Sequence, residues 1–337
     1  MTSVHVRILE GFEDPTFRPA DWAKLLSTGS TDVVFLTPEW QRAWWMAYGR
    51  GRLMLLLAEV GGEAVALMPL FTDEGMGYLV GSGGSDYLDI IGRVDDAEVL
   101  GALLSAAKEN ISGFIGFVFY HLRSNSGTNN CLPAVAEQLG LRCFGESDME
   151  APFLTLPSGP GYWAADKKSL VRHESYFRRE GELKVTHLTS GAAILRHLPE
   201  FFAQHIARWQ VTPHPSLFTH AANRFFYESL CLTASDVPWL RFTRLDWNGH
   251  PIAFHFGFSY RGVYMWYKPS FDINLARRSP GEVLLRQLLL AAAAEGATYF
   301  DFGLGTETFK RRFADRSATI HSWSLYDPGV VVATGAA

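Results

Sequence analysis

The apolar and polar positions of the first half of the chain follow both the two-residue period of strands and the 3.6-residue period of helices. Leu53 to Val60 is an apolar run that Gly61-Gly62 separates from a second run, Ala64 to Phe71, which predicts a β-hairpin. Apolar residues at helical spacing follow Pro38, with Thr37 as the predicted N-cap. The other elements expected in this half are strands at 5–9, 78–80, 87–91, 116–121 and 153–156, and helices at 97–109 and 132–139.

The second half repeats this order. Asn248-Gly249 joins two strand patterns at 240–247 and 251–260, which predicts another hairpin. Apolar residues at 283, 284, 288 and 291 lie on one face of a helix expected over 281–295, which Gly296 ends. The other expected elements are strands at 263–267, 298–302 and 317–326, and helices at 197–209, 221–232 and 306–313. The repeated order predicts an α+β protein built from mixed sheets, in which one unit is duplicated.

A segment rich in Gly, Pro and Ser, Ser158 to Ser169, separates the two halves. It predicts one domain over residues 1–160 and a second over residues 161–337, with a helical connector at 167–179. That connector carries a basic stretch that includes Lys167, Lys168 and His173. The stretch is either a solvated helix face or the place where an anionic donor docks.

Composition narrows the classes of function. The chain has 337 residues, 47% of them hydrophobic and 14% aromatic, which excludes global disorder. Its net charge of −5 argues against a general nucleic-acid binder. Three cysteines without a CxxC pair predict no disulfide framework and no metal site. Neither a secretory signal nor a transmembrane pattern is found, so we expect a cytoplasmic protein.

Candidate chemistry begins with the segment Arg277-Arg278-Ser279-Pro280-Gly281, which leads into the helix expected over 281–295. Backbone N–H groups at a helix N-terminus, together with the helix dipole, bind anions. A glycine lets phosphate oxygens approach the backbone, and an arginine adds a bidentate contact. The alternative is an ordinary turn with exposed arginines.

This segment and the sequence around it resemble a known family. Arg278-Ser-Pro-Gly281-Glu282-Val283 resembles the pyrophosphate loop of the GNAT acyltransferase superfamily, with valine at a position where that family has glycine or alanine. The longer blocks YKPSFDINLARRSPGEVLL, DFGLGTETFKRRF and GGSDYLDII resemble the CelD-like acyltransferases, which are related to the FemAB-like aminoacyl transferases. The resemblance covers most of the chain. It implies two tandem GNAT-like domains and acyl transfer from a thioester to an amine.

A second block, from Asp301 to Arg312, follows a predicted strand. Asp301 at the strand end can take a proton from an attacking amine. Glu307, Lys310 and Arg311 share one helical face, where the two cations can hold phosphate. The alternative is a capped helix with a solvated basic face. The resemblance favours the functional interpretation.

The remaining candidates are an acidic turn and an aromatic strand. Asp86 and Tyr87 follow a glycine-rich turn, and the resemblance makes them residues of a cleft that orients the acceptor amine. Alternation places Trp266 and Tyr267 on opposite faces of one strand, where Tyr267 can protonate the departing thiolate. His255, in a neighbouring strand, is a further candidate base. For the aromatic residues and the histidine, the alternative is core packing.

These observations predict an N-acyltransferase without a covalent enzyme intermediate, because no activated Ser or Cys is found. An acyl-CoA or an acyl-carrier protein is the expected donor, and a small-molecule amine the acceptor; no bound cofactor and no nucleic acid are expected. The alternatives are a FemAB-like aminoacyl-tRNA-dependent transferase and a non-catalytic binding protein, toward which Val283 points. The predicted catalytic residues are Asp301, Tyr267, Glu307 and His255. The predicted donor-binding residues are Arg277, Arg278, Ser279, Gly281, Glu282, Val283, Lys310 and Arg311. The predicted acceptor-binding residues are Asp86, Tyr87 and Trp266.

Overall fold

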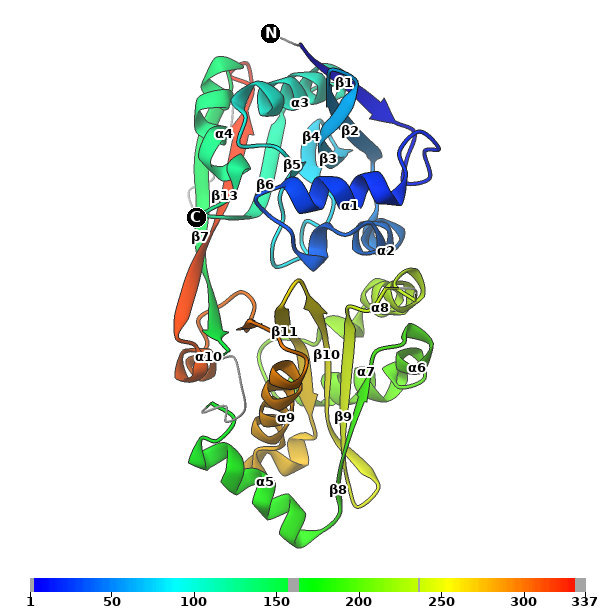
Figure 1. Cartoon of the computed structure of the whole chain (residues 1–337), viewed down its shortest axis with the longest axis vertical. Coiled ribbons are helices and arrows are strands. Elements are labelled where there is room, and N and C mark those ends of the chain that lie inside the picture. Colours follow the sequence, from blue (N-terminus) through cyan, green and yellow to red (C-terminus); the bar gives the residue numbers. More distant parts are fainter. Residues whose placement is uncertain (1–2, 157–163, 236, 331–337) are drawn as a thin grey trace. The chain divides into compact units, whose positions relative to one another are not determined.

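The chain divides into two compact units, of which unit 1 comprises residues 1–150 and 318–337 and unit 2 residues 151–317 (Figure 1). The structure is a computed structural model that describes residues 3–156, 164–235 and 237–330. Half of the predicted boundary segment 158–169, at 158–163, therefore lies outside the described residues. Within the described ranges, no helix combines the length and the apolar character that crossing a bilayer requires.

Unit 1 is built on a mixed sheet with the strand order β1-β2-β3-β4-β6-β13, and β5 pairs with β3. The β4–β6 pair is parallel, whereas the other neighbours are antiparallel. Thr37 caps α2 as predicted, because its side chain accepts a hydrogen bond from the backbone N–H of Trp40. The strands are β1 (Val4–Leu9), β2 (Arg52–Val60), β3 (Glu63–Asp73), β4 (Met76–Leu79), β5 (Ile91–Gly92), β6 (Gly116–Arg123) and β13 (Arg316–Tyr326); the helices are α1 (Pro19–Thr28), η1 (Val34–Leu36), α2 (Pro38–Tyr48), α3 (Ala97–Asn110) and α4 (Gly127–Gln138).

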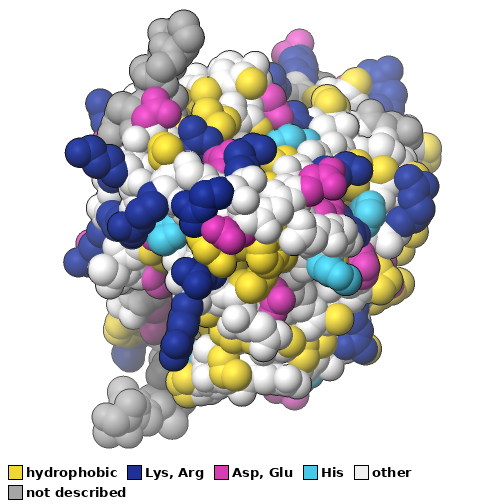
Figure 2. Space-filling view, turned by 90° about the horizontal axis from the view of Figure 1, so that it is seen from below, with side chains coloured by type: hydrophobic (Ala, Val, Ile, Leu, Met, Phe, Trp, Pro, Cys, Tyr) yellow, Lys and Arg dark blue, Asp and Glu magenta, His cyan; other side chains and the backbone are white. Residues whose placement is uncertain are grey.

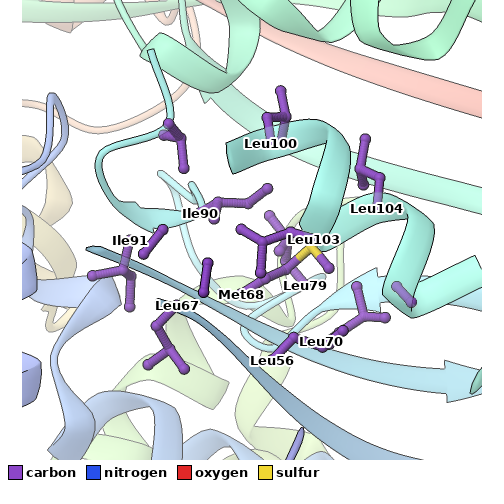
Figure 3. Close-up of a cluster of buried hydrophobic side chains, with 14 of the residues drawn as sticks. Leu56, Leu67, Met68, Leu70, Leu79, Ile90, Ile91, Leu100, Leu103 and Leu104 are labelled. Carbon is purple, nitrogen blue, oxygen red and sulfur yellow. The ribbon is translucent and has the colours of Figure 1, made fainter. Parts of the chain in front are cut away.

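The core of unit 1 lies between α3 and the central strands. Figure 3 shows Leu100, Leu103 and Leu104 of α3 above Leu67 and Met68 of β3. All of these side chains are fully buried. Because burial of each large aliphatic side chain contributes about 1.5–3 kcal/mol, this layer fixes α3 on the sheet.

Unit 2 is built on a second set of strands in the order β7-β12-β11-β10-β9-β8. The β11–β12 pair is parallel and the β9–β10 and β10–β11 pairs are antiparallel. The strands are β7 (Arg142–Thr155, which begins in unit 1), β8 (Leu183–Leu188), β9 (Leu240–Trp247), β10 (His250–Tyr260), β11 (Val263–Phe271) and β12 (Tyr299–Asp301); the helices are α5 (Lys168–Glu180), α6 (Gly191–Leu195), α7 (Leu198–Trp209), η2 (Leu217–Thr219), α8 (Ala221–Thr233), η3 (Ile273–Arg278), α9 (Pro280–Ala294) and α10 (Thr308–Phe313).

Both faces of the unit 2 sheet are covered. Tyr264 and Trp266 of β11 lie in a core with residues of α5 and α9. Tyr267, on the other face, packs against Tyr227 of α8, and Phe201 of α7 packs there against strands β9 and β10. The predicted alternation along β11 is therefore confirmed at these positions.

The two units repeat one order of elements but exchange their last strands. In unit 1, β4, α3 and β6 are followed by α4; in unit 2, β11, α9 and β12 are followed by α10. The strand beside β12 is β7, which ends the first half of the sequence, with Leu154 opposite Phe300. The strand beside β6 is β13, which ends the second half, with Leu325 opposite Phe117. Unit 1 thus includes residues 318–337, whereas the sequence-based ranges place these residues in the second domain. The cause is the pairing of β13 with β6, two strands that are distant in sequence.

Most predicted elements are present within a few residues of their predicted ends, and the differences lie mainly in α1, β5, β7, β8 and α6. The strand predicted at 87–91 is reduced to β5 (Ile91–Gly92) and an isolated bridge at Leu88. The prediction begins the β7 strand at residue 153, but the strand starts at Arg142. Residues 144–150 are exposed, so they show no alternation of apolar and polar positions. No prediction covers the helix α1, the strand β8 or the five-residue helix α6.

Candidate functional site

Strands β11 and β12 of unit 2 run side by side for a short distance only. Their parallel pairing ends at Met265 opposite Asp301, whereas β11 continues to Phe271. On its other edge β11 contains a bulge, because it advances from Met265 to Lys268 while β10 moves only from Phe258 to Phe256. Bulges bend a strand and increase its twist. Beyond Met265, β11 therefore has an edge to which the described part of β12 is not paired.

His255 fills the inside of this bulge. Its Nε2 accepts a hydrogen bond from the backbone N–H of Tyr267 at 3.2 Å, and its ring stacks on Tyr264 and Trp266. The side chain is fully buried, and burial lowers the pKa of His255 to about 3. A neutral ring that satisfies a backbone N–H group favours a structural role over the predicted role as base.

The N-terminus of α9 follows β11 through the short helix η3. Ser279, the N-cap, adopts a left-handed backbone with φ of 57°, and its side chain makes no capping hydrogen bond. Pro280 takes the first helical position. The first N–H groups of a helix have no partner within it. A Cβ at Gly281 would lie 3.2 Å from the Phe271 ring, so glycine permits this close packing.

The two arginines before Ser279 are exposed. The Arg278 guanidinium lies 4.4 Å from the centre of the Tyr176 ring on α5. Lys168 and Arg172 are exposed on the same helix. On the face drawn in Figure 2, Lys and Arg side chains gather on the left, the side on which Figure 1 places α5. A cationic surface thus borders the N-terminus of α9, as an anionic ligand requires.

Glu282 and Val283 have other partners than an anion. Arg312 donates a hydrogen bond to Glu282 at 2.7 Å and another to Ser169 at 2.6 Å, and His173 lies 3.5 Å from the second Glu282 oxygen. This network joins α5, α9 and α10 and balances the Glu282 charge. The Val283 side chain is fully buried in the core, and its N–H bonds to the Ser279 carbonyl at 3.3 Å. The valine that departs from the family pattern therefore does not project into the loop.

Asp301 stands at the end of β12, at the last residue pair with β11. Its Oδ1 accepts a hydrogen bond from the Gly303 N–H at 2.7 Å, which orients the half-buried carboxylate. The carboxylate therefore lies where the two strands separate.

The predicted residues of α10 differ in exposure. Glu307 is exposed and pairs with Lys310 at 3.0 Å. Lys310 is only 5% exposed, because its Nζ also donates a hydrogen bond to the Leu304 carbonyl. Arg311 is exposed. Lys310 thus closes the turn before α10, whereas the Arg311 side chain is exposed.

The predicted aromatic residues are largely buried. Tyr267 packs against Phe258, with ring centres 5.0 Å apart, and the Lys268 ammonium lies 4.0 Å from the Tyr267 ring centre. Trp266 packs against His255 and against Phe309 of α10. Both rings belong to β11, directly after the residue at which its pairing with β12 ends.

Asp86 and Tyr87 belong to unit 1. Tyr87 is 3% exposed, its ring lies edge-on to Phe35, and the Arg123 guanidinium lies 5.4 Å from its centre. Asp86 is half-buried beside it. Their predicted role toward the acceptor amine stays a prediction.

The corresponding helix of unit 1 does not resemble the N-terminus of α9. Asp96 caps α3 by accepting a hydrogen bond from the Glu98 N–H at 3.0 Å. The carboxylates of Asp96 and Glu98 therefore lie at the N-terminus of α3, the end of a helix at which an anion binds. In addition, the Leu88 N–H donates to the His121 carbonyl of β6, so the glycine-rich segment lies along β6. The N-terminus of α3 therefore carries a side-chain cap that the N-terminus of α9 lacks.

Two residues beside this site, Tyr176 and Ser169, were not predicted from the sequence, and His173 was predicted only as part of a basic stretch. All three lie on α5, at spacings of three and four residues that place them on one helical face. That spacing was available in the sequence, but their partners Arg278, Arg312 and Glu282 lie over one hundred positions away and only folding shows them.

Comparison with known proteins agrees with this geometry. Residues 165–311 match the family model of the acetyltransferase (GNAT) domain. The chain is similar in structure to FemX, with a TM-score of 0.62 and 9% identity over 91% of this chain and 96% of FemX. It is also similar to the C-terminal DUF2156 domain of a putative lysylphosphatidylglycerol synthetase from Agrobacterium fabrum, with a TM-score of 0.56 and 14% identity over 90% of each chain. No curated protein matches the chain significantly.

A third solved structure bears on the number of domains. A tandem GNAT protein from the clavulanic acid biosynthesis pathway matches 97% of this chain and 100% of its own, with a TM-score of 0.51 and 9% identity. At such identities these likenesses show the fold alone. The predicted fold class, an α+β protein with two tandem GNAT-like domains, is confirmed.

Proposed function

Because the chain belongs to the GNAT superfamily of acyltransferases, with the family's domain at residues 165–311, we propose that unit 2 binds an acyl-CoA or another phosphopantetheine thioester and transfers its acyl group to an amine. The observation that carries this proposal is the N-terminus of α9, which has no side-chain cap and follows, after the short helix η3, a bulged strand that separates from its neighbour.

The phosphates of the donor are proposed to bind at the start of α9. The Ser279 side chain leaves the Gly281 N–H uncapped at this end, whereas the N–H groups of Glu282 and Val283 donate to the Ser279 carbonyl. Arg278 supplies a planar guanidinium held against Tyr176, and Arg277 a second positive charge. Arg311 adds a third charge from α10. Glu282 and Lys310 have partners of their own and serve to hold these elements in place.

The thioester arm is proposed to lie along the free edge of β11 beyond Met265. An extended amide chain can pair with such an edge as an added strand does. The amine nitrogen attacks the thioester carbonyl carbon, the C–N bond forms, and the C–S bond breaks to release a thiolate. The nitrogen loses one proton and the thiolate gains one, so the products are an amide and a free thiol.

Asp301 is the proposed acceptor of the amine proton. It stands where β11 and β12 separate, and the Gly303 N–H fixes its orientation. Glu307 is exposed and paired with Lys310, and His255 is buried inside the bulge, so both are less suited to this step. Tyr267 remains our candidate to protonate the thiolate.

Thiol release and calorimetry test the proposal. The full chain is mixed with a panel of acyl-CoAs and amines, free thiol is measured, and CoA binding is followed by calorimetry. We expect Arg278→Gln to weaken CoA binding at least tenfold, or about 1.4 kcal/mol. Asp301→Asn should lower kcat by about 100-fold or more without weakening CoA binding.

The exposed Arg52 of unit 1 gives the matched control. Arg52→Gln should change neither CoA binding nor thiol release. A folded chain that neither binds CoA nor releases thiol from any thioester of the panel would disprove the proposal.

A second candidate is an aminoacyl-tRNA-dependent transferase of the FemAB-like kind. The observation in its favour is the basic side of α5, where Lys168 and Arg172 are exposed beside Arg278. Nucleic-acid binding depends on such cations and weakens steeply with salt. Transfer of a labelled amino acid from charged tRNA, abolished by ribonuclease and with no turnover of acyl-CoA, would establish this candidate in place of the first.

A non-catalytic binding role loses its sequence support. Val283 was the residue that suggested a degenerate donor loop, but its side chain lies in the core. The loop itself keeps Arg278 and Gly281 in positions that suit a donor.

A further inference from the structure

His121 of unit 1 has a backbone conformation that is rare for a side chain of its size. Its φ is 62°, in the left-handed region, although it lies within strand β6. The strand contains a bulge at this point, because β6 advances from Phe119 to Leu122 while β13 moves only from Trp323 to His321. Strained residues at bulges are frequent at functional sites, where they redirect a side chain.

Three hydrogen bonds hold this conformation. The His121 N–H donates to Ser322 Oγ at 3.3 Å, and its carbonyl accepts from the Leu88 N–H at 3.0 Å. The ring Nδ1 lies 2.8 Å from the Ser85 carbonyl oxygen. Backbone and ring are therefore both fixed, although the residue is only half-buried.

The contact with Ser85 determines the tautomer of the neutral ring. A carbonyl oxygen can only accept a hydrogen bond, so Nδ1 must carry the proton. Nε2 is then the ring nitrogen with the lone pair. The half-buried His121 thus provides an oriented hydrogen-bond acceptor in unit 1.

Arg123 lies two residues further along the same strand. Its guanidinium is 5.4 Å from the centre of the Tyr87 ring. Its Nε is buried and has no hydrogen-bond partner, and no carboxylate of the described residues pairs with it. A half-buried arginine in this condition is suited to a bidentate anion such as a carboxylate.

Both side chains contact one short segment, because the His121 ring lies against the Ser85 carbonyl and the Arg123 guanidinium lies near the Tyr87 ring. We propose that His121 and Arg123 form a binding site in unit 1 for an α-amino or α-hydroxy acid. Arg123 binds the carboxylate, and His121 Nε2 accepts a hydrogen bond from the neighbouring N–H or O–H group.

Binding to the full chain tests this site without reference to acyl transfer. L-alanine and L-lactate are the probes; propionate lacks the N–H or O–H group, and ethylamine lacks the carboxylate. The Nε2 signal of His121 in ¹⁵N NMR reports on its hydrogen bond directly. We expect saturable binding of alanine or lactate with a shift of that signal, and binding at least tenfold weaker for propionate and for ethylamine.

Two variants separate the two contacts. His121→Asn suits the left-handed backbone, and its amide can donate to the Ser85 carbonyl, but it lacks the Nε2 acceptor. Arg123→Gln removes the guanidinium. Each should weaken binding at least tenfold, whereas His321→Asn, a matched change on β13, should not.

The wild-type measurement keeps the test valid if a variant does not fold. Absence of saturable binding of both probes to the folded wild-type chain would overturn the proposal, whether or not the chain transfers acyl groups. Unchanged binding in folded Arg123→Gln or His121→Asn would overturn it as well.

Discussion

Two histidines of unit 2 are buried as neutral rings with hydrogen-bond partners. His255 accepts from the Tyr267 N–H, and His205 lies 2.8 Å from Ser216 Oγ. Burial lowers the pKa of each to about 3, and for His205 the nearby cations Arg208 and Lys268 act in the same direction. Both rings therefore serve as neutral hydrogen-bonding groups, His255 toward the backbone of a strand and His205 toward a side chain beside α7, because burial disfavours the charged imidazole.

This burial predicts a dependence of stability on pH. Unfolded His255 has a pKa of about 6.5, whereas the folded value is about 3. Between these values the unfolded chain binds a proton that the folded chain does not, so stability falls as pH decreases through that window. From pH 7.5 to 5.5, the free energy of unfolding of the wild type should fall about 1.4 kcal/mol more than that of His255→Gln.

Urea titrations at the two pH values measure this difference. The exposed His250 on β10 supplies the control, and His250→Gln should show the wild-type loss. An equal loss in wild type and His255→Gln would contradict the assignment of His255 as a neutral buried ring.

At the scale of elements, the bulge of β11 shapes the candidate donor site. The bulge lies between the first part of β11, which pairs with β12, and the last part, which continues toward η3 and α9. It depends on Gly257 of the neighbouring strand, where a Cβ would lie 2.4 Å from the Met265 carbonyl oxygen and 2.2 Å from a His255 ring carbon. Only glycine leaves room there for the ring and the backbone together.

Gly257→Ala should therefore destabilise unit 2 by about 2–4 kcal/mol, and lower CoA binding with it. Gly101→Ala is the matched comparison, because Gly101 lies inside α3 and its Cβ would meet only Val135 at 3.7 Å. That change should raise stability by about 0.5–1 kcal/mol. Urea unfolding of both variants checks the two signs, and a Gly257→Ala chain as stable as wild type would refute the packing argument.

At the scale of the whole chain, unit 1 is completed by the end of the sequence. Strand β13 pairs with β6 from Ile320 to Tyr326, and Lys108 of α3 pairs with Asp327 at 3.0 Å. An unpaired β6 would expose a row of backbone donors and acceptors along a core strand. The division of the chain at the middle of its sequence consequently does not separate two complete folding units.

A fragment of residues 1–160 should therefore fail to unfold cooperatively in urea. A second fragment, in which a Gly/Ser linker joins residues 1–160 to 318–330, should regain a cooperative transition because β6 then has its partner strand. Circular dichroism during urea titration distinguishes the two. A cooperative transition of the shorter fragment at the wild-type midpoint would show that β13 is dispensable to unit 1.

The sequence by itself determined the local elements. Thr37 and Pro38 start α2, Asn248-Gly249 turns a hairpin, and Gly296 follows α9 with a φ of 72°, all as predicted. These features depend on capping, turn chemistry and periodicity, which act within a few residues. The position of the α9 N-terminus after an aromatic strand was predictable for the same reason.

Only the tertiary structure decided which strands complete each unit and which side chains meet. Nothing near β13 in sequence specifies β6 as its partner, since the pairing joins residues about two hundred positions apart. The pairing of Glu282 with Arg312, the burial of Lys310 and the position of His255 inside a bulge likewise depend on distant neighbours. Charge and hydrogen-bonding capacity can be read from a residue's type, but the partner that uses them is set by the packing of the whole chain.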